Sequence, residues 1–140
     1  MPDVNKIFGL FSNENNNNQP PGEVFVDFMN SPEAKIGMFV KLIQNNIVFN
    51  QKIKQFFKQA NKEFDEEATK KSSEFSVYNR AWYYIKGVDI DNKDHLYAVV
   101  KQDTHYLLES LGLALKYFES KEEYEKCAHI HKIEKIVKEI

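Results

Sequence analysis

The feature that most constrains this chain is a long helical pattern with almost no helix breakers. No proline occurs between residues 33 and 86, and Gly37 is the one glycine in that stretch. Apolar residues recur there at spacings of mostly three and four, which is typical of helices with a buried stripe. The stripe comprises Phe39, Leu42, Ile43, Ile47, Phe49, Ile53, Phe56, Phe57, Ala60, Phe64 and Ala68. The pattern predicts two or three helices, or one long helix with a break near residues 70–73.

Start signals place the beginning of the helical region. In "NSPEAK", Ser31 suits the N-cap, Pro32 the first helical position and Glu33 the first turn. Just before it, Val24, Val26 and Phe28 alternate with polar residues, which predicts a short extended segment. Further along the chain, Gly87 is expected to cap the C-terminus of a helix.

The second half of the chain is also helical in pattern. A helix is predicted over residues 94–120, capped by Asp91 or Asn92, with a tight turn at 119–121 and a last helix to Ile140. The predicted fold is therefore all-α, a bundle of four to five helices forming a single domain over residues 32–140. Residues 1–31 are predicted to be a flexible, Asn/Pro-rich N-terminal arm, because "SNENNNNQPPG" offers little apolar surface to bury.

An apolar cluster lies at the start of that arm. Ile7, Phe8, Leu10 and Phe11 precede the Asn-rich stretch. An exposed apolar patch on a tether is suited to docking on another surface, so these four residues are candidate tail-docking residues. The alternative interpretation is a plain chain terminus.

Composition excludes several classes of protein. The 140 residues fit one domain, and a net charge of −2 excludes a globally basic nucleic-acid protein but not a local basic patch. The single cysteine, Cys127, cannot form an internal disulfide, which favours a reducing compartment. No apolar run approaches the ~20 residues of a membrane span, and no secretion signal is visible, so we expect no membrane association and a cytoplasmic location (host cytoplasm or virion if viral). Eighteen lysines against Arg80 alone indicate an AT-rich genome, such as that of a phage.

Metal and cofactor chemistry finds little support in the sequence. No histidine follows a glutamate by three residues, and His129 and His131 are two apart, so they point about 200° apart on a helix. Cys127 and His131 have a suitable spacing but are only two ligands. The loop at Asp89 and Asp91 lacks the glycine and the final glutamate of a calcium loop. We predict no metal site and no cofactor.

Catalytic patterns are equally sparse. Cys127 falls on the apolar stripe of its helix, as expected for a small core residue. The five glycines are scattered, so no phosphate-binding loop is present. The sequence therefore predicts no catalytic residues and a protein that is not an enzyme.

An acid-free, lysine-rich stretch runs from Ala34 to Lys62. The candidate polyanion- or partner-binding residues in it are Lys41, Lys52, Lys54, Phe57, Lys58 and Lys62. Lysine stripes bind phosphate through counterion release, and one of the two adjacent phenylalanines can offer a stacking surface. The alternatives are that the lysines only solvate a core helix, or that they pair with acids such as those at 63–67, within the bundle or between copies.

The C-terminal hairpin resembles a known motif. Residues 114–136 contain an acidic turn, an aromatic, two small residues and then spaced apolar residues: Glu122, Glu123, Tyr124, Cys127, Ala128, Ile130 and Ile133. In this order they resemble the UVR motif, a helical hairpin of UvrB/UvrC-type repair proteins and of some Clp-associated proteins. The resemblance implies a hairpin that pairs with a like hairpin or another helix. Cys127 stands where alanine is usual, and the usual basic-acidic pair is replaced around His131 and Lys132.

Together these features predict a small, non-enzymatic helical protein-interaction or regulatory protein that docks on a protein partner and can form a homo-oligomer. One alternative is a nucleic-acid-binding accessory protein that uses the lysine-rich 34–62 face. Another is a virion or assembly component whose first 22 residues lie across a neighbour.

Overall fold

The computed structural model describes residues 27–60 and 66–140 of the chain. In these ranges the regular structure is helical and contains no strand, which confirms the predicted all-α bundle. A short helical turn at residues 27–29 precedes five helices. These are α3 (Pro32–Ala60), α4 (Glu66–Ile85), α5 (Lys93–Lys101), α6 (Thr104–Ser120) and α7 (Tyr124–Lys138).

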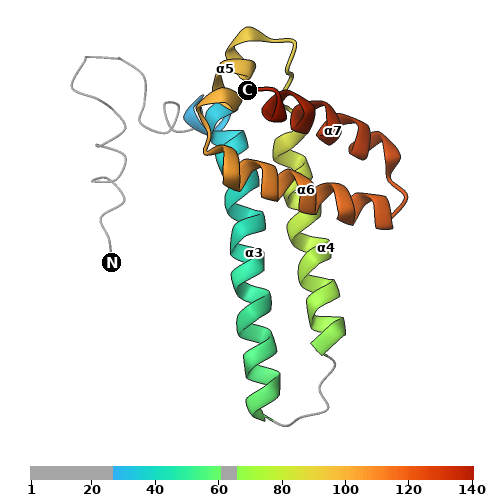
Figure 1. The fold of residues 1–140 in the computed structure, drawn as a ribbon. Coiled ribbons are helices and arrows are strands. Elements are labelled where there is room, and N and C mark those ends of the chain that lie inside the picture. Colours follow the sequence, from blue (N-terminus) through green and yellow to red (C-terminus); the bar gives the residue numbers. More distant parts are fainter. Residues whose placement is uncertain (1–26, 61–65) are drawn as a thin grey trace, which may run out of the picture.

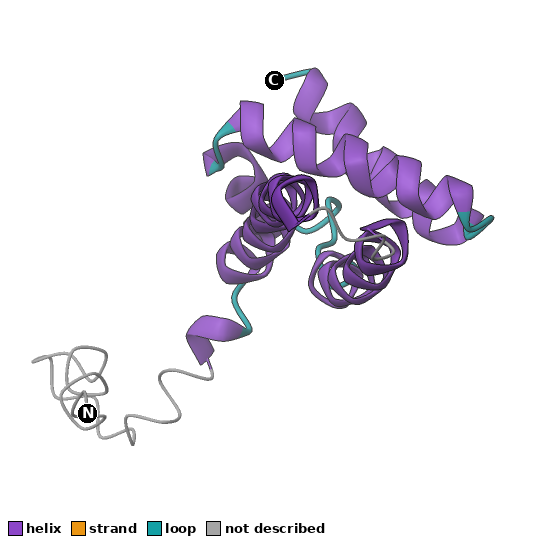
Figure 2. Ribbon diagram, turned by 90° about the horizontal axis from the view of Figure 1, so that it is seen from below, coloured by secondary structure: helices purple, strands orange, loops and turns teal. Residues whose placement is uncertain are grey.

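The helices form two unequal parts. The two longest, α3 and α4, lie side by side and antiparallel, while α5, α6 and α7 gather around one end of this pair (Figure 1). Viewed along the axes of α3 and α4, the hairpin of α6 and α7 lies across them (Figure 2). We call this end the base; it includes residues 32–46 of α3 and 78–85 of α4. The remainder of the α3–α4 pair projects beyond it.

The hydrophobic core fills the base. Its largest fully buried side chains include Phe39 and Ile43 of α3, Leu111 and Phe118 of α6, and Ile130 of α7. Ala81 and Ile85 bring α4 into the same core, and Ala98 and Val99 bring in α5. The apolar face of each helix is therefore buried only where this end of the molecule supplies neighbours.

Side-chain caps mark the starts of α3, α5 and α6. The Ser31 hydroxyl accepts a hydrogen bond from the Ala34 N–H at 3.2 Å, which confirms the predicted start of α3. The Asn92 side chain accepts from the N–H groups of Asp94 and His95, as predicted for α5. The single helix predicted over 94–120 is wrong, because it is interrupted at Gln102 and Asp103. The Asp103 side chain accepts from the Tyr106 N–H at 3.2 Å and starts α6.

Three other expectations are corrected. Helix α4 continues through residues 70–73, where a break was predicted, and the Ser73 hydroxyl instead accepts a hydrogen bond from α3. Phe28 lies in a helical turn rather than an extended segment, while Val24 and Val26 lie outside the described residues. Gly87 follows the end of α4 without a positive φ. A Cβ at this glycine would stand 2.9 Å from Lys35 Nζ.

The turn between α6 and α7 is closed by backbone hydrogen bonds. The Glu123 N–H donates to Phe118 O at 2.9 Å, and the Glu122 N–H donates to Glu119 O at 3.0 Å. This pair of bonds is the Schellman arrangement, which needs a left-handed residue after the helix. Glu122 takes that position with a φ of 59°, the one positive φ among the described non-glycine residues.

Candidate interaction surface

The projecting end of the α3–α4 pair is the most unusual surface of the molecule. We call it the distal hairpin; it comprises residues 47–60 of α3 and 66–77 of α4. No side chain described in these two ranges is buried, whereas Asn46 and Tyr78, which bound them, both are. The end of α3 also extends beyond the first turn of α4 (Figure 1). The distal hairpin is thus two helices without a core of their own.

A polar junction separates the distal hairpin from the base. Asn46 Nδ2 donates to Ser73 Oγ at 2.7 Å, and Asn50 Nδ2 donates to Asn46 Oδ1 at 3.3 Å. Asn50 Oδ1 is buried and makes no hydrogen bond within the described part of the chain. The side chains that face across the α3–α4 pair beyond this junction are at most half-buried, so less apolar surface is removed from water there than in the base.

Beyond the junction, α4 presents small side chains to α3. A groove of about 490 Å³ is lined by Phe49 of α3 and by five residues of α4: Ala68, Thr69, Ser72, Ser73 and Ser76. The groove stays open because the α4 residues opposite Phe49 are small.

Helix α3 also carries three large apolar side chains that its packing on α4 leaves largely exposed. Asn46, Asn50, Ile53 and Phe57 share the face toward α4, since they are spaced by four, three and four residues. Phe49 and Phe56, one heptad apart, lie at one edge of that face, and Phe49 lines the groove with α4, whereas Val48 points to the opposite side of α3. Their exposed fractions are 48%, 42% and 59% for Val48, Phe49 and Phe56. We call these three residues the outer stripe.

The sequence pattern predicted one stripe over this stretch and did not distinguish the outer stripe from the face toward α4. The signal that separates them is the adjacent pair Phe56 and Phe57. Neighbouring residues on a helix point about 100° apart, so one face cannot hold both. Phe57 is half-buried, and its ring lies 5.4 Å from that of Phe56, edge to face. On α4, Phe75 adds a further exposed ring to the distal hairpin.

The structure distributes the predicted lysines over two sides of α3. Lys41, Lys52, Lys54 and Lys58 are all exposed. Lys54 and Lys58 are one turn apart and lie together, but Lys52 is two residues before Lys54 and points about 200° away from it. Lys62 lies outside the described residues, as do Ile7, Phe8, Leu10 and Phe11 of the predicted docking tail.

Acids of α4 reduce the positive charge of the distal hairpin. Its described residues hold five lysines (52, 54, 58, 70, 71) and three glutamates (66, 67, 74), which gives 5 − 3 = +2. Lys71 Nζ pairs with Glu67 at 3.3 Å within α4. No ion pair joins a lysine of α3 to an acid of α4 in the described ranges. The α3 lysines are therefore solvated rather than used to hold the hairpin together.

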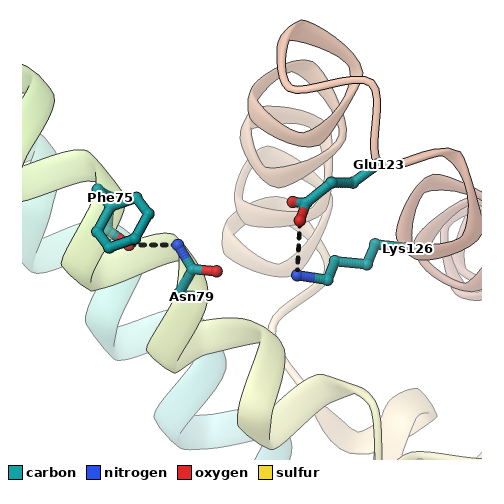
Figure 3. Close-up of polar contacts among 4 residues, drawn as sticks. All are labelled: Phe75, Asn79, Glu123 and Lys126. Atoms are coloured by element: carbon teal, nitrogen blue, oxygen red, sulfur yellow. Dashed lines mark hydrogen bonds and ion pairs between the residues drawn. The ribbon is translucent and has the colours of Figure 1, made fainter.

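The base holds a cluster that the sequence did not reveal. Lys126 Nζ lies 5.6 Å from the centre of the Trp82 ring and 5.0 Å from that of Phe118, and it pairs with Glu123 at 3.2 Å. The His129 ring packs edge to face on Trp82, and its Nε2 donates to the Ile85 carbonyl at 2.8 Å. Figure 3 shows the Glu123–Lys126 pair at the start of α7, with α4 alongside, where the Asn79 side chain donates to the Phe75 carbonyl. The contacts of Lys126 and His129 with Trp82 and Ile85 hold the C-terminal hairpin against α4.

A pair of tyrosines joins α4 to α6 in the same region. The rings of Tyr78 and Tyr117 stack with their centres 4.5 Å apart. Burial, with further contributions from Glu74 and Tyr117, raises the pKa of Tyr78 to about 12. Burial also raises the pKa of Tyr117, helped by Glu123 and Glu74. Both phenols are therefore neutral packing groups near neutral pH.

A hollow and a buried cysteine complete the chemical features of the described residues. A hollow of about 560 Å³ between α7 and the α4–α5 loop offers three lysines (86, 132, 135) and three acids (89, 91, 139), so it selects no charge. Cys127 is buried, and that burial, followed by Glu119, raises the pKa of its thiol. Within residues 27–60 and 66–140, no three His, Cys, Asp or Glu side chains are placed to share a metal ion. None of the helices described is both long and apolar enough to cross a membrane.

Comparison of the chain with protein-family models, with curated proteins and with solved structures finds no match in any of the three. The assignment of a function therefore depends on the surfaces described above.

Proposed function

We propose that this chain is a non-enzymatic helical interaction protein that binds a protein partner through the distal hairpin. The observation that carries the proposal is the outer stripe, whose three apolar side chains of α3 remain 42–59% exposed among the described helices. A helix with apolar residues on two sides is typical of one that packs against neighbours on both. Helix α4 supplies the first neighbour, and the partner supplies the second.

The shape of the surface favours a helical partner. Residues 47–60 of α3 span roughly 20 Å, which is enough for several turns of a second helix to lie alongside. The exposed rings of Phe49, Phe56 and Phe75 offer large apolar anchors, the type of residue that often dominates binding energy. Small residues of α4 in the groove beside Phe49 leave room for an inserted side chain.

The α3 lysines support partner selection more than binding strength. Lys52 borders the outer stripe between Val48 and Phe56, and exposed lysines at the edge of an apolar contact favour a partner with acidic side chains there. The nucleic-acid alternative is less well supported. The lysines lie on two sides of α3, and three glutamates share the same hairpin.

Affinity purification of the full chain from its native or infected cell tests the proposal, with parallel samples treated with nuclease. We expect a co-purified protein that resists nuclease and is lost with Phe56→Ser. The co-purified protein should be retained with Tyr124→Ser, which removes a ring of similar exposure (66% against 59% for Phe56) from the base. A partner retained by Phe56→Ser but lost with Tyr124→Ser would contradict the proposal.

The nucleic-acid alternative makes a different prediction for the same experiment. It expects nucleic acid in the untreated sample only, and loss of that nucleic acid with the double change Lys54→Glu and Lys58→Glu. That result, with no dependence on Phe56, would replace the proposed function by the alternative.

A further inference from the structure

A second apolar surface lies at the opposite end of α3, in the base. A groove of about 340 Å³ runs between the helical turn at 27–29 and the first turns of α3. It is lined by Phe28, Met29, Glu33, Ala34, Gly37, Met38 and Lys41. Glu33, Gly37 and Lys41 succeed one another at four-residue spacing, so the Cα atoms of Glu33 and Lys41 stand about 12 Å apart along the helix with the glycine between them. The middle of the groove is therefore apolar.

Gly37 is a glycine that the fold itself does not require. It lies inside α3 without a positive φ, and a Cβ added to it would meet no atom within 4 Å. Glycine in a helix interior is less favourable than alanine by about 1 kcal/mol. Because Gly37 has no side chain, a group that approaches α3 from outside can come close to its backbone.

We propose that the groove at Gly37 is the binding site of the chain's own N-terminal segment, residues 7–11. This segment holds four large apolar side chains within five residues: Ile7, Phe8, Leu10 and Phe11. The described chain begins at Asp27, directly beside Phe28 and Met29 of the groove, so the preceding residues start from its edge. The inference concerns a different surface from the distal hairpin and does not rest on the proposed function.

The connecting length suits binding within one chain. Fifteen residues (12–26) join the apolar segment to Asp27, and a flexible chain of that length spans roughly 23 Å. Such a tether gives a local concentration on the order of millimolar, above that of a second copy at ordinary protein concentrations. Met29 and Met38 line the groove with flexible thioether side chains, which adapt to aromatic rings such as those of Phe8 and Phe11.

Methionine methyl NMR of the full chain tests the proposal directly. The chain has three methionines, Met1, Met29 and Met38, so two of the three labelled methyl signals report on the groove. We expect the double change Phe8→Ser and Phe11→Ser to shift the signals of Met29 and Met38. The matched change Phe56→Ser, at the far end of α3, should leave both signals in place.

Two further samples distinguish binding of the chain's own segment from binding of a second copy. In a chain with Gly37→Leu, which places a side chain into the groove, the Phe8 and Phe11 changes should no longer move the two signals. Dilution of the wild-type chain should also leave them unchanged. The proposal is overturned if the Phe8 and Phe11 changes move neither signal, or if they still move both in the Gly37→Leu chain. Signals that change with dilution would assign the groove to a second copy instead.

Discussion

Two phenylalanines of the same helix are predicted to respond very differently to the same truncation. Phe39 of α3 is fully buried in the base, while Phe56, seventeen residues later, is 59% exposed in the distal hairpin. Truncation of a fully buried phenylalanine to alanine removes about 3–5 kcal/mol of stability, because apolar burial is lost and a cavity remains. Phe56 keeps only about two fifths of its surface covered, so Phe56→Ala should cost about 1 kcal/mol or less.

Thermal and urea unfolding of the two variants, followed by circular dichroism, measures this difference. In a domain of this size 1 kcal/mol shifts Tm by roughly 3–4 °C, so the loss of about 3–5 kcal/mol in Phe39→Ala should lower it by roughly 9–20 °C. Phe56→Ala should lower it by no more than roughly 4 °C. Comparable losses for the two variants would mean that the outer stripe is already covered within the free protein, and the division into base and distal hairpin would be wrong.

Three further predictions concern the base. Lys126→Met should destabilise the fold by about 1–2 kcal/mol, since it removes a positive charge that contacts Glu123 and two aromatic rings. Lys71→Met loses only one exposed ion pair and should change stability by less than about 0.5 kcal/mol. Equal urea midpoints for the two variants would contradict this difference. Glu122→Gly should stabilise the fold by about 1 kcal/mol in the same urea assay, because glycine adopts the left-handed backbone of the α6–α7 turn without strain. A loss of stability in this variant would contradict the assignment of strain to Glu122. The folded state holds the Tyr78 proton more tightly than the unfolded chain, so its contribution is complete below about pH 10 and is lost as the pH rises toward 12. Tyr78→Phe should weaken this alkaline decline, and an unchanged pH profile of stability would argue against it.

Helix starts were predictable because they depend on a few neighbouring residues. Ser31 and Asn92 supply side-chain acceptors to N–H groups two or three residues ahead, and both caps are found as expected. The Asp103 side chain likewise accepts a hydrogen bond at the start of α6. The apolar pattern continues across Asp103, however, and therefore predicted one uninterrupted helix over residues 94–120. The missed break shows that a cap can outweigh uninterrupted periodicity when the two disagree.

Burial beyond Asn46 was not predictable from the pattern. The apolar spacing of α3 continues to Phe57, yet α5 and α6 cover only its first half. Periodicity shows which face of a helix is apolar, but it does not show where neighbouring helices end. The cluster of Trp82, Phe118 and Lys126 was missed for a related reason, since it joins residues from three helices and has no local signature.

The central claim, that a protein partner packs on the outer stripe, is tested most directly by photo-crosslinking in the native or infected cell. A photoreactive phenylalanine analogue replaces Phe56 in one sample. In the other it replaces Tyr124, which has a similar exposure in the base. The account predicts a nuclease-resistant crosslink to a protein from position 56 and none from position 124. A crosslink from position 124 alone, or a crosslink from position 56 that nuclease removes, would contradict it.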